Sequence, residues 1–131
     1  MRVSIFRLAG LLALTAGAWM AAAAHASDSA WPRVAHAENE FCEIDVSSNG
    51  KFFRIDTSGL VPGSVGRFVL TNEDIAPLRY AMLADSEGQW SKYYLPFLWH
   101  RPSGVVSVEL RNGDCAISAS FPWERNAGEA W

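Results

Sequence analysis

The feature that most constrains this chain is the alternation of apolar side chains on both sides of an Asn-Gly pair, Asn112-Gly113. Successive side chains of a β-strand point to opposite faces, so alternation over this length predicts two strands that each bury one face. An Asn-Gly pair between two such runs favours a two-residue type I′ turn, because both central positions of that turn need a positive φ. We therefore expect a hairpin. The apolar positions of its inward face are Val106, Val108 and Leu110 before the pair and Cys115, Ile117, Ala119 and Phe121 after it.

The same pattern recurs from about residue 40 onward. A second pair, Asn49-Gly50, follows the alternating positions Cys42, Ile44 and Val46 and predicts a second hairpin. No stretch shows a sustained helical period, and 131 residues suffice for one domain. About seven short strands in one domain favour an all-β fold, an antiparallel two-sheet sandwich rather than a barrel. The other expected strands lie around residues 53–55, 68–70, 78–84 and 90–95.

The first 26 residues have the pattern of a secretory signal peptide. Arg2 and Arg7 give a positive start, Leu8 to Ala24 is an uncharged apolar run, and Ala24-His25-Ala26 is a small-x-small cleavage box. An uncleaved membrane anchor is the alternative, but the second half of the run is rich in weakly hydrophobic alanine. We expect cleavage, no membrane association afterwards, and a periplasmic or secreted protein. The expected layout is a signal peptide (1–26), a flexible tail (27–39), the sandwich domain (40–123) and a second flexible tail (124–131).

Both cysteines, Cys42 and Cys115, lie in the expected mature chain. Export places them in an oxidising compartment, where a pair of cysteines usually forms a disulfide. Each is also in phase with the apolar face of its strand. The sequence therefore predicts one internal bridge between the first hairpin and the last.

Charge and motif content exclude several functions. The net charge is −3, and removing Arg2 and Arg7 leaves 9 basic and 14 acidic side chains, a net charge of −5 over 105 residues. A nucleic-acid partner is not expected, since it needs a basic face or tail. The mature chain has two histidines, His36 and His100, in no metal-binding spacing, and it lacks the Gly-x-Ser-x-Gly motif. We expect no enzymatic activity, no metal and no cofactor.

Two segments in the middle of the chain carry a family resemblance. Ser58-Gly59-Leu60-Val61-Pro62-Gly63-Ser64-Val65 and Ala84-Asp85-Ser86-Glu87-Gly88-Gln89-Trp90 resemble bacterial immunoglobulin-like, or fibronectin-like, modules of exported and surface proteins. In those modules a Pro-Gly turn precedes a strand, and an Ala-Asp-x-x-Gly-x-Trp segment turns a corner. The resemblance implies a single-copy immunoglobulin-like sandwich with a binding or structural role, and it implies no catalytic residue.

The segment from Trp90 to Pro102 holds five aromatic rings within ten positions, more than one strand buries on one side. Exposed aromatic clusters on rigid scaffolds mark binding sites. Within the segment we expect Tyr93, Trp99 and Arg101 to be exposed. The alternative is that the rings pack over the open end of the core. The expected core positions are Trp90, Leu95 and Leu98, and the candidate binding residues are Tyr93, Tyr94, Trp99, His100 and Arg101.

These observations favour a non-enzymatic exported protein that binds another exported or envelope protein. A glycan is the alternative partner, as for a carbohydrate-binding module, and a small inhibitor of an exported hydrolase would use the same aromatic segment. A third possibility is a structural subunit that joins its neighbours through an exposed strand edge.

Overall fold

The computed structural model describes residues 31–125, which form eight strands and no helix. The expected signal peptide and most of the expected C-terminal tail lie outside the described residues. Within residues 31–125, no helix is long and apolar enough to cross a bilayer. In chain order the strands are β1 (Arg33–Glu38), β2 (Glu43–Ser48), β3 (Phe53–Ser58), β4 (Val65–Asn72), β5 (Leu78–Leu83), β6 (Trp90–Tyr94), β7 (Ser103–Asn112) and β8 (Cys115–Glu124).

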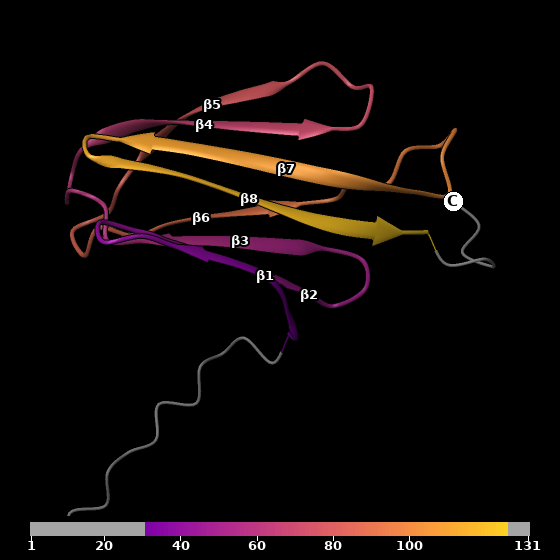
Figure 1. Cartoon of the computed structure of the whole chain (residues 1–131), viewed down its shortest axis with the longest axis horizontal. Coiled ribbons are helices and arrows are strands. Elements are labelled where there is room, and N and C mark those ends of the chain that lie inside the picture. The colour runs from indigo at the N-terminus through magenta and orange to yellow at the C-terminus, as the bar shows by residue number, and fades with distance from the viewer. Residues whose placement is uncertain (1–30, 126–131) are drawn as a thin grey trace, which may run out of the picture.

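The strands form two antiparallel sheets of four, as a two-layer sandwich (Figure 1). One sheet has the order β1-β2-β3-β6 and the other has the order β5-β4-β7-β8. The chain runs through three strands of the first sheet, passes to the second sheet for β4 and β5, returns for β6, and ends with the β7–β8 hairpin. The expected antiparallel sandwich is confirmed, with eight strands where seven were expected.

The core lies between the sheets and follows the alternation in the sequence. On β7 and β8 the positions expected to face inward are buried or half-buried, and the residues between them are exposed. Side chains from both sheets meet across the interior, where the Phe53 and Phe121 rings stack at 4.7 Å. Burial of such a shared apolar face is the main force that holds two sheets together.

The additional strand is β1, which lies within the segment 27–39 that we expected to be a flexible tail. It pairs antiparallel with β2 from Arg33 opposite Ser47 to Glu38 opposite Glu43. Its half-buried positions that pack inward carry alanine, so the segment has no apolar period that a sequence pattern detects. The expected tail is wrong for residues 33–38, and at the other end the sandwich includes Glu124, the last residue of β8.

Both hairpins form, but neither uses the expected type I′ turn. Asn112 pairs with Cys115 as the last residue of β7, so the two turn residues are Gly113 and Asp114. Gly113 has a φ of 56°, whereas Asp114 does not have a positive φ, which fits a type II′ turn. Asn112 stays in the strand because its buried side chain is bonded inside the fold: its Nδ2 donates to Ser64 Oγ at 2.8 Å. The other hairpin has a four-residue connection, 49–52.

The disulfide between Cys42 and Cys115 is present, as the sequence predicts. The two Cα atoms are 5.7 Å apart, and the bridge joins residues 73 positions apart. It lies inside the sandwich and ties the start of β2 to the first residue of β8, so it links the two sheets. Such a bridge indicates an oxidising, extracytoplasmic environment.

The two segments that resemble immunoglobulin-like modules lie against each other. The amide of Leu60 donates to the carbonyl of Gly88 at 3.0 Å, and the amide of Gly63 donates to the carbonyl of Ala84 at 3.1 Å. Gly88 has a φ of 73°, and a Cβ there would lie 2.3 Å from the carbonyl oxygen of Leu60, so this close approach requires glycine. The two crossings between the sheets therefore brace the same end of the sandwich as the disulfide.

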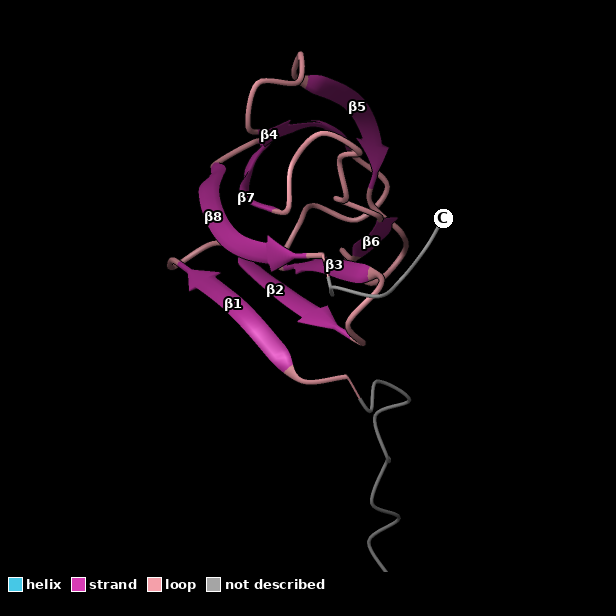
Figure 2. Cartoon of the chain, turned by 90° about the vertical axis from the view of Figure 1, so that its right-hand side faces the viewer, coloured by secondary structure: helices cyan, strands magenta, loops and turns pink. Residues whose placement is uncertain are grey.

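The opposite end carries the connections that hold most of the candidate binding residues. The β4–β5 loop (73–77), the β6–β7 loop (95–102) and the end of β8 meet there, at the right-hand side of Figure 1 and facing the viewer in Figure 2.

Candidate binding site

The aromatic segment comprises strand β6 and the β6–β7 loop, and each of the two contributes rings both to the core and to the solvent. Trp90, Tyr94 and Phe97 pack against the buried core. Tyr93 is 59% exposed and Trp99 is 86% exposed. Sealing the core and presenting rings to solvent are therefore tasks of different members of the segment.

The predicted exposures are mostly confirmed. Tyr93 and Trp99 are exposed, and Arg101 is half-exposed, held by two carboxylates. Trp90 and Leu98, expected in the core, are half-buried against it. Leu95 was expected in the core and is 41% exposed. The reason is that Leu95 lies on the outward side of the alternation, in phase with Tyr93, whereas the following inward position after Tyr94 is taken by the buried Pro96.

The two exposed rings are not part of one cluster. Tyr93 lies on the outer face of the first sheet, where its ring meets the edge of Trp31 at 5.9 Å and lies 6.0 Å from the guanidinium carbon of Arg54. Tyr94 points inward, and burial raises the pKa of its phenol. Of the five predicted binding residues, only Trp99, His100 and Arg101 share the β6–β7 loop.

The start of this loop is anchored by a buried amide. The Nδ2 atom of Asn72 donates to the Pro96 carbonyl at 2.7 Å and to the Tyr94 hydroxyl oxygen at 3.1 Å. Its Oδ1 accepts a hydrogen bond from the Trp123 indole at 2.9 Å. Asn72 is buried, so these bonds satisfy polar groups that water does not reach.

The end of the loop is anchored by Arg125. Its guanidinium donates to the carbonyl of Trp99 at 3.1 Å and to that of Leu98 at 3.5 Å. Its backbone amide donates to the carbonyl of Pro102 at 2.8 Å. The residue that carries the exposed indole is thus held through its own carbonyl oxygen, which leaves the ring free for contact.

The third anchor joins the loop to the β4–β5 loop. The Nε of Arg101 lies 3.2 Å from Asp74 Oδ1, and the Nε2 of His100 lies 3.4 Å from the same oxygen. The pKa of the Asp74 carboxyl is held below its usual range. The largest cause is a hydrogen bond from the backbone amide of Asp74 itself, and the hydrogen bond from His100 and the positive charge of Arg101 act in the same direction. Glu73 has a backbone φ of 50°, a value that residues other than glycine rarely adopt. Its carboxylate accepts a hydrogen bond from the Val105 amide at 2.6 Å.

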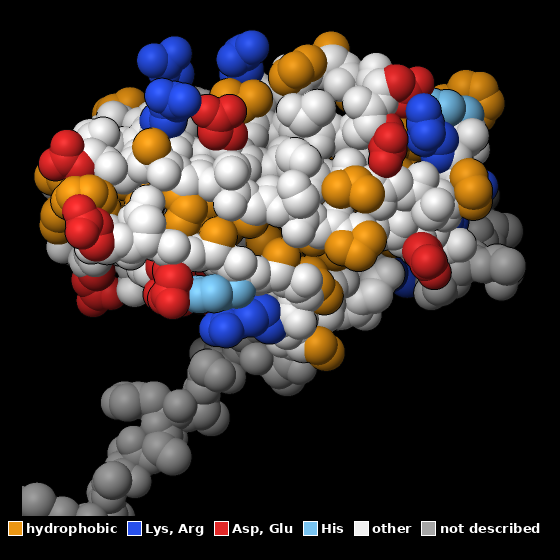
Figure 3. All heavy atoms as spheres, in the orientation of Figure 1, with side chains coloured by type: hydrophobic (Ala, Val, Ile, Leu, Met, Phe, Trp, Pro, Cys, Tyr) orange, Lys and Arg blue, Asp and Glu red, His pale blue; other side chains and the backbone are white. Residues whose placement is uncertain are grey.

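Trp99 therefore stands at the end of the sandwich on a loop that is fixed at three points. Its ring meets the neighbouring His100 ring at 5.3 Å, edge to face. In Figure 3 the right-hand end of the molecule combines hydrophobic, basic, acidic and histidine side chains within a small area. The arrangement places one large apolar ring beside charged side chains that can form hydrogen bonds, which suits non-covalent recognition.

One further cluster has potential metal ligands. His36, Glu43 and Asp45 bring a ligand atom each within 4.8 Å of one another on the outer face of β1 and β2. His36 Nδ1 lies 2.9 Å from Asp45 Oδ1, and the Nε of Arg33 lies 2.8 Å from the same oxygen. Arg33 already pairs with the Asp45 oxygen that a metal ion would need as a ligand, so we interpret these residues as an ion-pair cluster.

Sequence reasoning missed the residues that hold the loop: Asn72, Glu73, Asp74 and Arg125. Glu73-Asp74 reads as an ordinary turn, and Arg125 lies in the segment expected to be a tail. Asn72 could have been recognised, because it is the next inward position of the strand after Phe68 and Leu70. A polar residue at an inward strand position indicates a buried hydrogen-bonded group.

No protein family, curated protein or solved structure matches this chain. The resemblance to immunoglobulin-like modules therefore stays a prediction.

Proposed function

We propose that this protein is a non-enzymatic, exported binding module that docks another exported or envelope protein through the Trp99 loop, residues 95–102. The observation that carries the proposal is the contrast between the exposed Trp99 ring and its fixed backbone. A soluble domain gains no stability from an indole in solvent, and exposure of a large apolar group favours association.

The anchoring gives this exposure its significance. A binding residue on a mobile loop must be ordered when the partner binds, at a cost of about 0.5–1.5 kcal/mol for each immobilised side chain, besides the ordering of the loop. Here Asn72, Arg125 and Asp74 order the loop in advance. Tryptophan is also among the residues most enriched at the energetic centres of interfaces.

The groups around the ring favour a protein partner. Arg101, His100 and Asp74 form a mixed-charge rim beside the indole, which is the usual anatomy of an interface with an apolar centre and a polar border. A partner with an apolar pocket bordered by hydrogen-bonding groups fits this surface.

Photo-crosslinking tests the proposal. A photoreactive phenylalanine analogue replaces Trp99 in one variant and Phe41 in another, and each is exported by the producing cell. Phe41 is the matched control because it is an exposed aromatic residue beside Cys42, at the disulfide end of the sandwich. We expect a discrete protein adduct from position 99 and none from position 41. Equal adducts from both positions, or none from either, would overturn the proposal.

A glycan array distinguishes the alternative partner. Saturable binding of a sugar by the wild-type protein that is lost in Trp99→Ala would replace the protein partner with a carbohydrate. The same anchored ring would then stack on a sugar, and the crosslinking variants would yield no protein adduct.

A further inference from the structure

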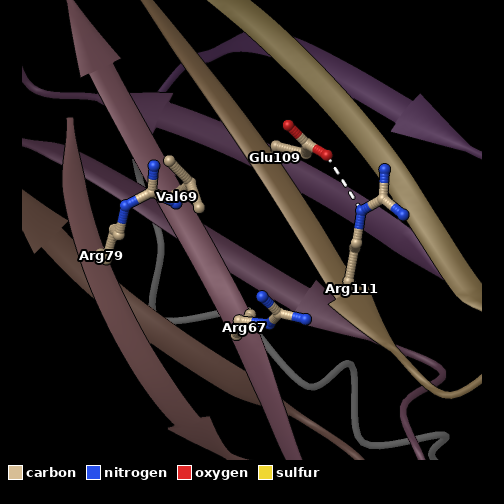
Figure 4. A pocket seen from close by; sticks show the side chains of 5 residues that line it. All are labelled: Arg67, Val69, Arg79, Glu109 and Arg111. Atoms are coloured by element: carbon tan, nitrogen blue, oxygen red, sulfur yellow. Dashed lines mark hydrogen bonds and ion pairs between the residues drawn. The ribbon is translucent and has the colours of Figure 1, made fainter.

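A second surface, on the outer face of the second sheet, combines three arginines around a hollow. The hollow has a volume of about 340 Å³ and shares no residue with the Trp99 loop. Figure 4 shows its lining, and in Figure 3 basic side chains gather at the top of the molecule over the same sheet. The lining residues are Arg67, Val69, Arg79, Glu109 and Arg111.

Strand register brings these side chains together. Arg67 on β4 lies directly opposite Arg111 on β7. Two residues along β4, Val69 lies between Arg79 on β5 and Glu109 on β7. Three guanidinium groups thus come from three adjacent strands, and the half-buried Val69 forms an apolar floor between them.

The positive charge of this group is poorly compensated. Arg111 Nε lies 3.0 Å from Glu109 Oε1, which is the one ion pair within the hollow. Arg67 and Arg79 form no ion pair with any carboxylate of residues 31–125. The chain as a whole carries a net charge of −3, so this face is opposite in sign to the protein.

This arrangement costs stability in the free protein. Like charges directly opposite each other on neighbouring strands are destabilising, and Arg67 and Arg111 occupy such a pair of positions. An oxyanion between the guanidinium groups removes the repulsion and adds charge-assisted hydrogen bonds.

We propose that this hollow binds a phosphate-type oxyanion, either free or carried by a lipid headgroup. The planar guanidinium fork matches the oxygens of phosphate, and a tetrahedral anion has enough oxygens to serve Arg67, Arg79 and Arg111 together. Glu109 sets the limit on affinity, because it competes with the anion for Arg111.

Titration calorimetry with inorganic phosphate at low ionic strength tests the site. We expect Arg67→Gln and Arg79→Gln each to weaken phosphate binding at least tenfold. Glu109→Gln should strengthen it about threefold or more, because it frees Arg111. The matched control is Arg54→Gln, which removes one positive charge from the outer face of the other sheet and should stay within twofold of wild type.

Vesicle sedimentation identifies the source of the phosphate. Binding to phosphatidylglycerol but not phosphatidylcholine vesicles, lost in Arg67→Gln, assigns a lipid headgroup, whereas phosphate binding without vesicle binding assigns a soluble phosphate ester. The proposal would be overturned if the protein bound neither phosphate nor either kind of vesicle. It would also be overturned if Arg54→Gln and Arg67→Gln lost the same amount of phosphate affinity. Binding of an acidic peptide alone would also overturn it. Thermal unfolding without phosphate serves as the folding control, since Arg67→Gln relieves repulsion and should leave the midpoint unchanged or higher.

Discussion

The indole Nε1 of Trp123 donates a hydrogen bond to Oδ1 of Asn72 at 2.9 Å, between the last strand and the end of β4. The same amide holds Pro96 and Tyr94 through its Nδ2. One buried side chain therefore connects the core of the second sheet to the loop that presents Trp99.

Loss of this amide should destabilise the fold. Asn72→Ala leaves the Trp123 indole N–H and the Pro96 carbonyl without partners in a buried environment, at about 1–3 kcal/mol each. We expect the free energy of unfolding in urea to fall by about 2–6 kcal/mol. The control is Asn49→Ala, which removes side-chain bonds in an exposed turn and should cost about 1 kcal/mol or less. Equal effects of the two substitutions would contradict the role assigned to Asn72.

Arg125 should control the order of the loop more than the stability of the fold. Arg125→Gln removes the guanidinium that holds the Leu98 and Trp99 carbonyls, so amide hydrogen exchange in residues 97–101 should accelerate about tenfold or more. Exchange in β2 and β7 should not change. Arg33→Gln, which removes an exposed ion pair on the first sheet, serves as the control. Unchanged protection of the loop in Arg125→Gln would show that other contacts hold it.

The disulfide should contribute a large share of the stability. Closing a loop of 73 positions is worth roughly 4–4.5 kcal/mol by the chain-entropy relation. The double variant Cys42→Ser, Cys115→Ser should lose about that much free energy of unfolding in urea. A loss under about 1 kcal/mol would mean that the bridge constrains the unfolded chain far less than its span implies.

The His36 cluster should give a measurable pH dependence. A hydrogen bond to Asp45 raises the pKa of His36 above 6.5, although the nearby Arg33 opposes the shift. Because the folded pKa is raised, the stabilising contribution is present below pH 6.5 and is lost as the pH rises through the raised value. NMR titration should find the pKa of His36 above 6.5 in wild type and lower in Asp45→Asn. A pKa that does not respond to this substitution would contradict the assignment.

The sequence pattern predicted the sandwich because alternation directly encodes which side of a strand is buried. The same reasoning placed Cys42 and Cys115 inside. It missed β1, whose inward positions are alanines and whose place is fixed by pairing with β2 rather than by its own hydrophobicity. It also misplaced Leu95, which lies on the outward side of the alternation, while the buried Pro96 takes the next inward position.

The binding end was predictable only in part. A tryptophan beside two prolines indicates an exposed loop, and Trp99 is exposed. The residues that fix the loop lie 26 or 27 positions away from it, such as Asp74 and Arg125, and no local pattern relates them to it. Long-range polar contacts of this kind depend on sheet topology, which alternation does not specify.

The most direct test of the proposed function is the affinity of the partner captured at position 99 for three forms of the protein. Wild type, Trp99→Ala and Phe41→Ala are compared by titration calorimetry, with the urea midpoint as the folding control. Truncation of an aromatic residue at the centre of an interface costs about 2 kcal/mol or more, which corresponds to roughly thirtyfold in affinity. We predict a loss of that size in Trp99→Ala and a change of less than twofold in Phe41→Ala. Equal affinity of wild type and Trp99→Ala would contradict the proposed function.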